Sequence, residues 1–333
     1  MTGVALLGLG RAGSFHLASI RSLPGVRLAR VYDVDRARAE KVAAETGCVA
    51  AASDAEAIGA DDVDAVVIAT PTQTHHGYVV AALEAGVPVL SEKPLGVDLD
   101  EIDQCFSLAR DRGLPLLVAF QRRFDPSFAA AAAAVHAGEV GELQFIRSVS
   151  RDNPVPSIDY IKTSNGIFHD CIVHDFDLLC WIARETPEEV FAFGSNFLPD
   201  VKAIGDLDTV VVALRFASGL LASIDISRKS VYGYDQRLEV FGSRGMVQSE
   251  NRPQTMAVRS GEDGISAPPI DYSFPTRYRD AYRLELECFL DCVRGGREVP
   301  ITHEQVRAVH RLANAAEQSF REGRPVRVEP SPK

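Results

Sequence analysis

The stretch VALLGLGRAG, residues 4–13, decides the fold of the first half of the chain. Its apolar run, 4–7, predicts a short buried strand, and a helical pattern at 14–22 follows the glycine-rich turn. In a G-x-G-x-x-G turn the first glycine permits a tight turn, the second lets the backbone approach a pyrophosphate, and the third lets helix and strand pack closely. A glycine-rich turn without a ligand fits this strand–turn–helix context less well. We therefore expect a dinucleotide site, with the helix N-terminus directed at the phosphates, formed by Gly8, Gly10, Arg11, Ala12 and Gly13.

The first half of the chain repeats this order of strand and helix. Short apolar segments without polar alternation are typical of parallel strands covered on both faces, and the helices between them indicate crossover connections. The predicted strands are 4–7, 28–32, 65–69, 88–91 and 116–120, and the predicted helices are 14–22, 35–45, 75–85 and 100–112. These elements predict a Rossmann-type, doubly wound α/β domain with a parallel sheet.

The second half has longer strands and a different helix pattern. Alternation such as Leu-Ala-Ser-Ile-Asp-Ile-Ser near residue 224 indicates antiparallel strands with one face on helices and one face open. We predict strands at 143–150, 190–197, 208–216, 220–228, 237–242 and 245–249, and helices at 128–136, 166–183, 278–294 and 302–322. The expected division is a dinucleotide-binding domain at 1–122 and an α+β domain at 123–333, with a large, mostly antiparallel sheet. The C-terminal helix is the element that we allow to pack back on the first domain.

Composition excludes several classes of protein. The 333 residues are 46% hydrophobic and 24% charged, which is ordinary for a globular protein, and the formal charge of −11 disfavours a nucleic-acid partner. The six cysteines have no zinc or redox spacing, which suits a reducing compartment. The sequence shows neither a signal-peptide pattern nor a run of 18 apolar residues. We expect a cytoplasmic protein without a membrane partner or a metal.

Asp33 is a candidate for binding the cofactor's ribose. It closes the second predicted strand about 20 residues beyond the glycine turn, where an acid accepts hydrogen bonds from the adenosine ribose. Its carboxylate would also repel a 2′-phosphate, so we expect NAD rather than NADP. Arg36 and Arg38 follow closely and could offset that repulsion, although we interpret them as a solvated helix face.

Other candidates end the next two strands, at the carboxyl edge where open α/β sheets bind ligands. Thr70 and Pro71 follow the strand at 65–69, and the triplet Glu92-Lys93-Pro94 follows the strand at 88–91. An ammonium at this edge can hydrogen-bond a substrate hydroxyl and stabilise alkoxide charge, whereas the alternative is a surface lysine paired with Glu92. We expect Thr70, Pro71, Glu92 and Lys93 to contact the cofactor. The histidines at 75 and 76 are interpreted as ordinary first-turn residues.

The helix predicted at 166–183 carries a second constellation. Asp170 and His174 are four residues apart, so both project from one face, and a histidine beside a carboxylate suits proton transfer near neutral pH. A helix-surface ion pair is the alternative interpretation. His169 lies on another face and is left out of the site, and Asp175 and Asp177 are assigned to capping or structural pairing.

These motifs, in this order, closely resemble the Gfo/Idh/MocA oxidoreductases over nearly the whole chain. Four segments further along, QRRFD at 121–125, RDNP at 151–154, YGYD at 232–235 and YRDAY at 278–282, resemble the inositol 2-dehydrogenase branch of that family. Two positions depart from the pattern. Asn165-Gly166 stands where many members carry two glycines, and Arg151 stands where myo-inositol enzymes often have a histidine.

The resemblance implies hydride transfer from a secondary alcohol of a cyclic polyol, such as myo- or scyllo-inositol, to NAD. It implies His174 as general base, Lys93 as the group that polarises the same oxygen, and Asp170 as an orienting hydrogen-bond partner. Arg123, Asn153 and Tyr234 are expected to bind the remaining hydroxyls. The family also implies a homo-oligomer, a tetramer or dimer, formed through the open face of the C-terminal sheet.

Two other functions remain compatible with the residues. An aldose, amino-sugar or dihydrodiol dehydrogenase would keep the same chemistry and change the substrate. A non-enzymatic regulator that senses a dinucleotide would have no need to keep Lys93, Asp170 and His174 together.

Overall fold

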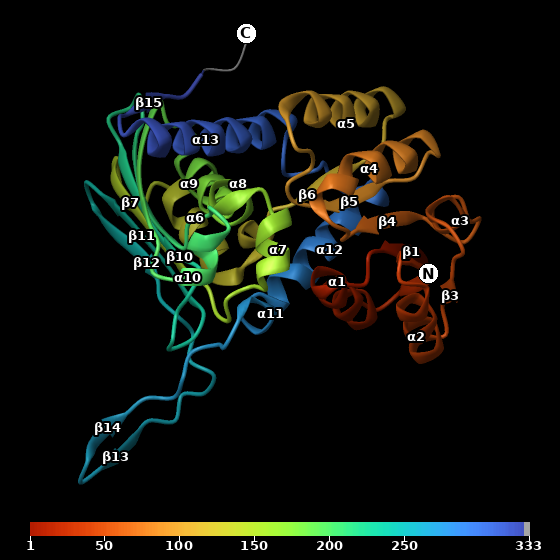
Figure 1. Ribbon diagram of the computed structural model, residues 1–333, viewed down its shortest axis with the longest axis horizontal. Coiled ribbons are helices and arrows are strands. Elements are labelled where there is room, and N and C mark those ends of the chain that lie inside the picture. Colours follow the sequence, from red (N-terminus) through yellow and green to blue (C-terminus); the bar gives the residue numbers. More distant parts are fainter. Residues whose placement is uncertain (330–333) are drawn as a thin grey trace. The chain divides into compact units, whose positions relative to one another are not determined.

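The computed structural model describes residues 1–329 and divides the chain into two compact units (Figure 1). The first unit contains Met1–Phe124 and Arg279–Arg307, and the second contains Asp125–Tyr278 and the chain from Ala308 onward. The expected division at residue 122 assigned all of 279–307 to the second domain. The structure differs because the helix of this segment packs against helices of the first unit.

The first unit is built on a six-stranded parallel sheet, as predicted. Its strand order, β3-β2-β1-β4-β5-β6, is that of the Rossmann fold, with the reversal of direction between β1 and β4. The four residues of β4, β5 and β6 are all buried, which explains why these strands lack polar alternation. The strands are β1 (Thr2–Leu7), β2 (Val26–Tyr32), β3 (Val49–Ala50), β4 (Ala65–Ile68), β5 (Val89–Glu92) and β6 (Leu116–Ala119).

Helices connect these strands, and side chains at their N-termini set where several of them begin. The carboxylates of Asp35 and Asp98 accept backbone N–H bonds from the first turns of α2 and α5, and Ser53 does the same for α3. The helices are α1 (Arg11–Ser22), α2 (Arg36–Thr46), α3 (Asp54–Ile58), η1 (Thr72–Thr74), α4 (His75–Glu84), α5 (Leu99–Arg112), η2 (Gln121–Phe124) and α12 (Arg279–Val293).

Helix α12 joins the first unit through aromatic and helix–helix packing. It contacts α1 and η2, and the ring of Tyr282 lies 5.8 Å from Phe15 and 5.5 Å from His16 between centroids. The apolar pattern of 278–294 predicted a helix with one buried face. It carried no information about which domain that face would cover.

The second unit contains a seven-stranded sheet in the order β12-β11-β7-β10-β9-β8-β15. Every neighbouring pair is antiparallel except β7 and β10, so the predicted mostly antiparallel sheet is confirmed. The strands are β7 (Leu143–Arg151), β8 (Glu189–Ser195), β9 (Thr209–Arg215), β10 (Leu221–Ser227), β11 (Asp235–Gly242), β12 (Gly245–Ser249) and β15 (Val326–Arg327).

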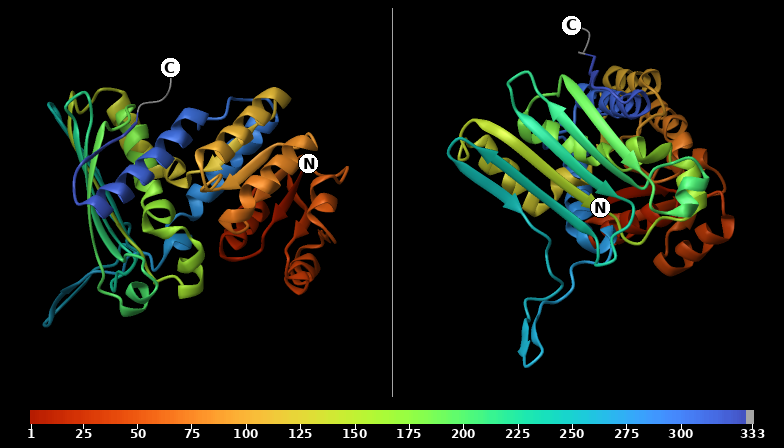
Figure 2. Two further views of the ribbon diagram at one scale, coloured as in Figure 1. Left: turned by 45° about the horizontal axis from the view of Figure 1, so that its top comes forward. Right: turned by 60° about the vertical axis from the view of Figure 1, so that its left-hand side comes forward.

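The helices of this unit lie on one face of the sheet (Figure 2). They are α6 (Pro126–His136), α7 (Ile158–Thr163), α8 (Gly166–Asp170), α9 (Val173–Ala183), α10 (Pro199–Ala203), α11 (Phe274–Arg277) and the part of α13 (His303–Glu322) from Ala308 onward. The opposite face carries no helix among residues 1–329 (Figure 2). Five large apolar side chains are exposed on strands of this sheet: Phe193, Val211, Leu221, Phe241 and Met246.

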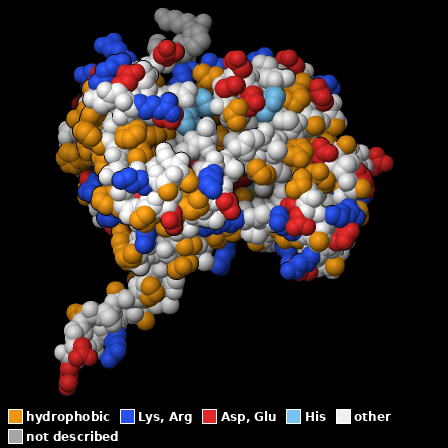
Figure 3. All heavy atoms as spheres, viewed as in Figure 1, with side chains coloured by type: hydrophobic (Ala, Val, Ile, Leu, Met, Phe, Trp, Pro, Cys, Tyr) orange, Lys and Arg blue, Asp and Glu red, His pale blue; other side chains and the backbone are white. Residues whose placement is uncertain are grey.

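A projecting arm extends from the sheet between β12 and α11 (Figure 1). It contains the hairpin of β13 (Arg259–Gly261) and β14 (Gly264–Ser266), and its side chains are almost all exposed. Glu262 and Asp263 form its acidic tip (Figure 3). The sequence predicted no element here, because these strands are too short and polar to show a buried face.

Candidate active site

The glycine-rich turn between β1 and α1 has the geometry of a dinucleotide site. Gly8 has a φ of +86°, and a Cβ there would lie 2.5 Å from the Ala69 carbonyl oxygen. A Cβ on Gly13 would lie 2.0 Å from the Gly8 carbonyl oxygen. A Cβ on Gly10, by contrast, would meet no heavy atom of the protein within 4 Å. Gly8 and Gly13 are therefore required for packing, whereas Gly10 leaves open space above the turn.

The N-terminus of α1 adds to this fit. Gly10 caps the helix without a side-chain hydrogen bond, and the first turn carries no acidic residue. Backbone N–H groups and the positive end of the helix dipole can therefore receive a pyrophosphate. The residues of the turn fit the diphosphate of NAD.

Asp33 follows β2 and is anchored at this turn. Its two carboxylate oxygens accept the backbone N–H groups of Leu9 and Asp35, each at 2.8 Å. Arg38 Nη1 lies 3.1 Å from Asp33 Oδ2, so this arginine pairs with Asp33 instead of only facing solvent as expected. Arg36 pairs with Glu40 at 2.8 Å on the exposed face of α2, as the interpretation of a solvated helix face predicted.

His75 links the ends of the two strands that carry Thr70 and Lys93. The imidazole is buried, with Nε2 2.8 Å from the Thr70 carbonyl oxygen and Nδ1 2.8 Å from the Pro94 carbonyl oxygen. Burial lowers the pKa of His75, while the two carbonyls and Glu92 oppose that shift. His75 is the first residue of α4, as predicted, and its imidazole also forms a clamp between the ends of these two strands. His76 follows it in the same turn, and its Nε2 lies 2.8 Å from Gln104 Oε1 on the neighbouring helix α5.

Glu92 is the last residue of β5 and is buried, and the partly exposed Lys93 follows it directly. Glu92 Oε1 is 2.9 Å from His16 Nε2, and the His16 side chain is fully buried. Burial alone would raise the pKa of Glu92, but His16, Lys93 and His75 hold it below its ordinary value. The Lys93–Pro94 peptide bond is cis. Glu92 is therefore an ionised anchor next to Lys93 and not part of a surface ion pair.

The segment 166–183 forms two helices where one was predicted. α8 ends at Asp170 and α9 begins at Val173, because the Ile172 N–H bonds to the Ile167 carbonyl oxygen at 3.1 Å, one residue further back than in an α-helix. Asp170 and His174 therefore lie on either side of an irregular turn. The rule that residues four apart share one face of a regular helix does not apply to them. Such π-type turns are frequent at functional sites.

The segment that enters α8 explains one departure from the family pattern. Asn165 has a φ of +65° and Gly166 a φ of +79°. Asparagine tolerates this left-handed conformation better than other residues with a Cβ. It can therefore replace the first of two glycines there.

Asp170 has two partners that the sequence did not reveal. The Tyr160 hydroxyl donates to Oδ1 at 2.8 Å, and Arg228 Nη1 lies 3.4 Å from Oδ2. Of its neighbours, His169 faces Glu317 on α13 at 3.4 Å, and Asp175 accepts the Ser148 and Ser150 hydroxyls at 2.6 Å. These contacts agree with keeping His169 out of the site and with structural pairing for Asp175.

The three residues expected to bind substrate hydroxyls have protein partners in the structure. Arg123 Nη1 donates to Gln305 Oε1 at 3.1 Å. Asn153 Nδ2 donates to the Tyr272 carbonyl oxygen at 2.8 Å. The buried ring of Tyr234 packs 5.9 Å from Tyr278 between centroids.

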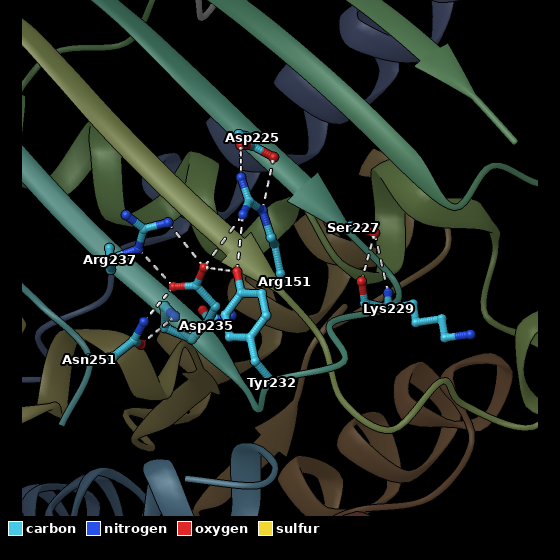
Figure 4. Close-up of polar contacts among 9 residues, drawn as sticks. Arg151, Asp225, Ser227, Lys229, Tyr232, Asp235, Arg237 and Asn251 are labelled. Atoms are coloured by element: carbon cyan, nitrogen blue, oxygen red, sulfur yellow. Dashed lines mark hydrogen bonds and ion pairs between the residues drawn. The ribbon is translucent and has the colours of Figure 1, made fainter. Parts of the chain in front are cut away.

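Arg151 belongs to a separate network at the end of the sheet (Figure 4). It pairs with Asp225 on β10, and its Nη1 donates to the Tyr232 hydroxyl at 3.0 Å. Tyr232 in turn donates to Asp235 at 2.6 Å, and Arg237 and Asn251 bind the same carboxylate. Ser148 and Ser150 on the same strand bond to α9, so Arg151, one residue further on, lies on the opposite face of β7.

Sequence reasoning missed four residues around the candidate site: His16, His75, Tyr160 and Arg228. Periodicity could have found two of them. Arg228 continues the buried positions Ala222, Ile224 and Ile226 of β10, and His16 lies on the buried side of α1. No sequence signal that we recognise identifies Tyr160 as the partner of Asp170.

Two observations on metals and membranes complete the description. Within residues 1–329, no three His, Cys, Asp or Glu side chains are grouped as a metal site would require. None of the helices in that part of the chain combines the length and apolar character that a membrane crossing needs.

The fold and the glycine turn together define a dinucleotide-binding oxidoreductase with a Rossmann domain and an α+β domain. A model described as an oxidoreductase family with an NAD-binding Rossmann fold matches residues 2–120, and one described as the GFO/IDH/MocA C-terminal domain matches residues 128–248. The chain belongs to the Gfo/Idh/MocA family, and its cofactor is NAD.

Similar proteins align with this chain along its whole length. An inositol 2-dehydrogenase of Rhizobium meliloti is 40% identical over 97% of this chain and 98% of its own. A myo-inositol 2-dehydrogenase of Thermotoga maritima is 38% identical over 98% of each chain. The crystal structure of a scyllo-inositol dehydrogenase from Lactobacillus casei, with NAD(H) and scyllo-inositol bound, superposes with a TM-score of 0.92 at 27% identity, over 98% of this chain and 99% of that one.

Proposed function

We propose that this protein is an inositol 2-dehydrogenase that oxidises a secondary hydroxyl of myo- or scyllo-inositol to the ketone with NAD. One observation carries the proposal. Relatives named inositol 2-dehydrogenase and myo-inositol 2-dehydrogenase align over nearly the whole chain. Lys93, Asp170 and His174 are the side chains to which we assign the chemistry, on the resemblance of their motifs to the family. A regulator that only senses the cofactor would not need this set of side chains.

The three side chains divide the proton chemistry between them. His174 removes the hydroxyl proton as general base, because a neutral imidazole is suited to this step near pH 7. Lys93 donates a hydrogen bond to the same oxygen and stabilises the negative charge that develops on it. Asp170 accepts a hydrogen bond from the substrate and orients it. NAD, when bound, would supply the acceptor for the hydride of the carbinol carbon.

The cofactor is held by the first unit in this proposal. Backbone groups of the turn bind the pyrophosphate and Asp33 binds the adenosine ribose. The remaining contacts come from residues at the carboxyl ends of β4 and β5. The proposed cofactor-binding residues are Gly8, Gly10, Arg11, Ala12, Gly13, Asp33, Thr70, Pro71, Glu92 and Lys93.

Three further residues are assigned to the polyol in this proposal. We assign the remaining ring hydroxyls to Arg123, Asn153 and Tyr234. Guanidinium, amide and phenol groups can each donate to a hydroxyl, and the last two can also accept. For Arg123, binding a hydroxyl would replace or share its bond to Gln305.

We also propose that the protein is a cytoplasmic homo-oligomer. The support for assembly is the sheet face without helices, on whose strands Phe193, Leu221 and Met246 are exposed. Exposed apolar side chains gathered on one face are typical of a surface that pairs with another protein. A twofold axis would let this face pair with the same face of a second copy, giving a dimer or, with one further contact, a tetramer.

The activity is tested by NADH formation at 340 nm with NAD and a panel of inositols, aldoses, amino sugars and diols. Turnover confined to inositols would support the proposal and rank myo- against scyllo-inositol. Turnover of an aldose or amino sugar alone would change the assigned substrate and leave the roles assigned to the side chains unchanged. NAD binding without turnover of any member would contradict the proposal and favour a regulator.

The base is tested by His174→Ala, with His136→Ala as a matched control in the same unit. Loss of a general base should lower kcat by roughly 10²- to 10⁴-fold and leave NAD affinity unchanged. His136 bonds to the Trp181 carbonyl oxygen at 3.2 Å, so its replacement removes a partly buried histidine with no assigned chemistry. Equal turnover by the two variants would mean that another group removes the proton.

A further inference from the structure

Asp170 is held on both carboxylate oxygens by side chains from other parts of its own unit. The Tyr160 hydroxyl, on α7, donates to Oδ1 at 2.8 Å. Arg228 Nη1, just beyond β10, lies 3.4 Å from Oδ2. Cys171 Sγ lies 3.7 Å from Oδ2, so Tyr160, Cys171 and Arg228 are among the charged and titratable groups that face this carboxylate.

The Arg228 guanidinium is itself fixed in one orientation. Its side chain is 0% exposed. Nε donates to the Leu207 carbonyl oxygen at 3.1 Å, and Nη2 pairs with Asp206 at 2.7 Å. The Arg228 backbone N–H also bonds to the Asp208 carbonyl oxygen at 2.7 Å. These bonds leave the guanidinium little freedom to turn away from Asp170.

Burying a charged arginine at this position costs free energy, which implies that the residue has a role that offsets this cost. β10 places Ala222, Ile224 and Ile226 on the face that packs on helices, and Arg228 continues that side. An apolar residue would be the ordinary choice there, since burying a charge is costly unless it is paired. Burial alone would lower the pKa of Arg228, but Cys171, Asp170 and Asp206 raise it above its ordinary value. The guanidinium is therefore a permanent positive charge beside Asp170.

We propose that Arg228 and Tyr160 are positioning residues, which hold the Asp170 carboxylate ionised and in the orientation that the substrate requires. This inference rests on the proposed function, in which Asp170 binds the polyol. Neither residue needs to touch the substrate, because both act through the carboxylate. A purely structural ion pair would stabilise the fold and leave the chemistry of Asp170 unchanged.

Tyr160→Phe is the informative variant, because it removes one hydroxyl from a half-exposed ring and keeps the packing. We expect it to lower kcat/KM by about 10-fold, the low end of what one hydrogen bond to a charged group contributes. In the Asp170→Asn background the same change should cost less than about 2-fold, since coupled residues are not additive. If the losses of the two single variants multiply in the double variant, Tyr160 does not act through Asp170.

The pH profile supplies a readout that a structural role would not change. A single essential general base predicts a slope of about one on the acid side of log kcat/KM against pH. Without the charge of Arg228 or the hydroxyl of Tyr160, the ionised form of Asp170 loses a stabilising contact, so protonation of this carboxylate should add to the loss of activity on the acid side. The acid limb of Tyr160→Phe and Arg228→Gln should therefore move to higher pH and become steeper.

Tyr232→Phe is the matched control. Tyr232 is also a half-exposed tyrosine, and its hydroxyl donates to the buried Asp235 at 2.6 Å in the separate network of Figure 4. It should keep the wild-type slope and kcat/KM. If Arg228→Gln does not fold, as judged by circular dichroism and NAD binding, Tyr160→Phe decides the matter alone.

The outcomes separate this inference from the proposed function. If Asp170→Asn turns over inositol like the wild type, Asp170 has no part in the reaction and both the assignment and the inference fail. If Asp170→Asn is impaired but Tyr160→Phe keeps the wild-type profile, only the positioning role is overturned. A steeper, shifted acid limb without additivity would establish it.

Discussion

Replacing Asp33 with asparagine should change which dinucleotide the protein prefers. Asp33→Asn removes the negative charge while keeping an oxygen that can accept the Leu9 N–H, now received at 2.8 Å. The Asp35 N–H loses its acceptor, because the second oxygen becomes an amide nitrogen. The change therefore alters the charge beside the ribose and leaves the glycine-rich turn in place.

The expected magnitude follows from two effects. A ribose hydroxyl that donates to a neutral oxygen instead of a carboxylate loses about 1 kcal/mol, which weakens NAD about 5-fold. A 2′-phosphate about 5 Å from Asp33 would lose a repulsion of about 3 kcal/mol per unit charge at an effective dielectric constant of about 20. Arg38, now 3.1 Å from Asp33, would also be released to pair with the phosphate. NADP affinity should rise by about 100-fold.

Calorimetric titration with NAD and with NADP measures both effects. The double variant Asp33→Asn/Arg38→Ala should lose about tenfold of the gained NADP affinity, since one charge-assisted hydrogen bond is missing. Thermal unfolding without cofactor controls for the bond lost at Asp35. A ratio of NADP to NAD affinity that stays within about threefold of the wild type would refute the reasoning, because the ribose would then lie away from Asp33.

Three further predictions concern the anchors of the site and the open sheet. His75→Gln should lower kcat by up to about 100-fold with little change in NAD affinity, because the clamp between Thr70 and Pro94 loosens near Lys93; parallel losses in kcat and NAD affinity would argue against it. Glu92, whose pKa is lowered, should stabilise the fold above its unfolded pKa of about 4.3 and lose this effect as the pH falls through the folded value. In urea unfolding, the advantage of the wild type over Glu92→Gln should thus shrink below about pH 4, and a gap independent of pH would exclude this linkage. Phe193→Asp should reduce the oligomer measured by light scattering, whereas Phe197→Asp, equally exposed but beyond the end of β8, should not; equal masses for both variants would remove the open face from the interface.

Strands of the first unit were predictable because they are buried on both faces. Four-residue runs such as Ala65–Ile68 and Leu116–Ala119 have no exposed position, so apolar residues follow one another without alternation. The placement of Arg279–Val293 was not predictable, because one apolar face does not identify the helix that it covers. The arm that contains β13 and β14 was not predicted for the opposite reason. Its side chains are almost all exposed, so the sequence shows no periodic pattern of buried residues there.

The candidate site was predictable in its motifs and not in its local geometry. Asp170 and His174 were paired on the assumption of a regular helix, and a single bond from Ile172 to Ile167 breaks that regularity. Hydrogen bonding within one turn depends on how the two flanking helices pack, which no spacing rule contains. The two residues were chosen for their chemistry, and that choice does not depend on the turn.

Two of the missed residues share a feature that the sequence does contain. Arg228 and His16 are polar side chains at positions where the strand or helix period demands a buried apolar one. The periodicity of the helix or strand predicts that such a side chain is buried, and the free-energy cost of burying it implies a polar partner. Periodicity does not identify that partner, because Glu92 is 76 residues from His16 and Asp170 is 58 residues from Arg228. Tertiary structure supplies those pairings, and in both cases the partner is a candidate site residue. Polar residues on predicted buried faces are therefore a reason to look for a site even where no motif is present.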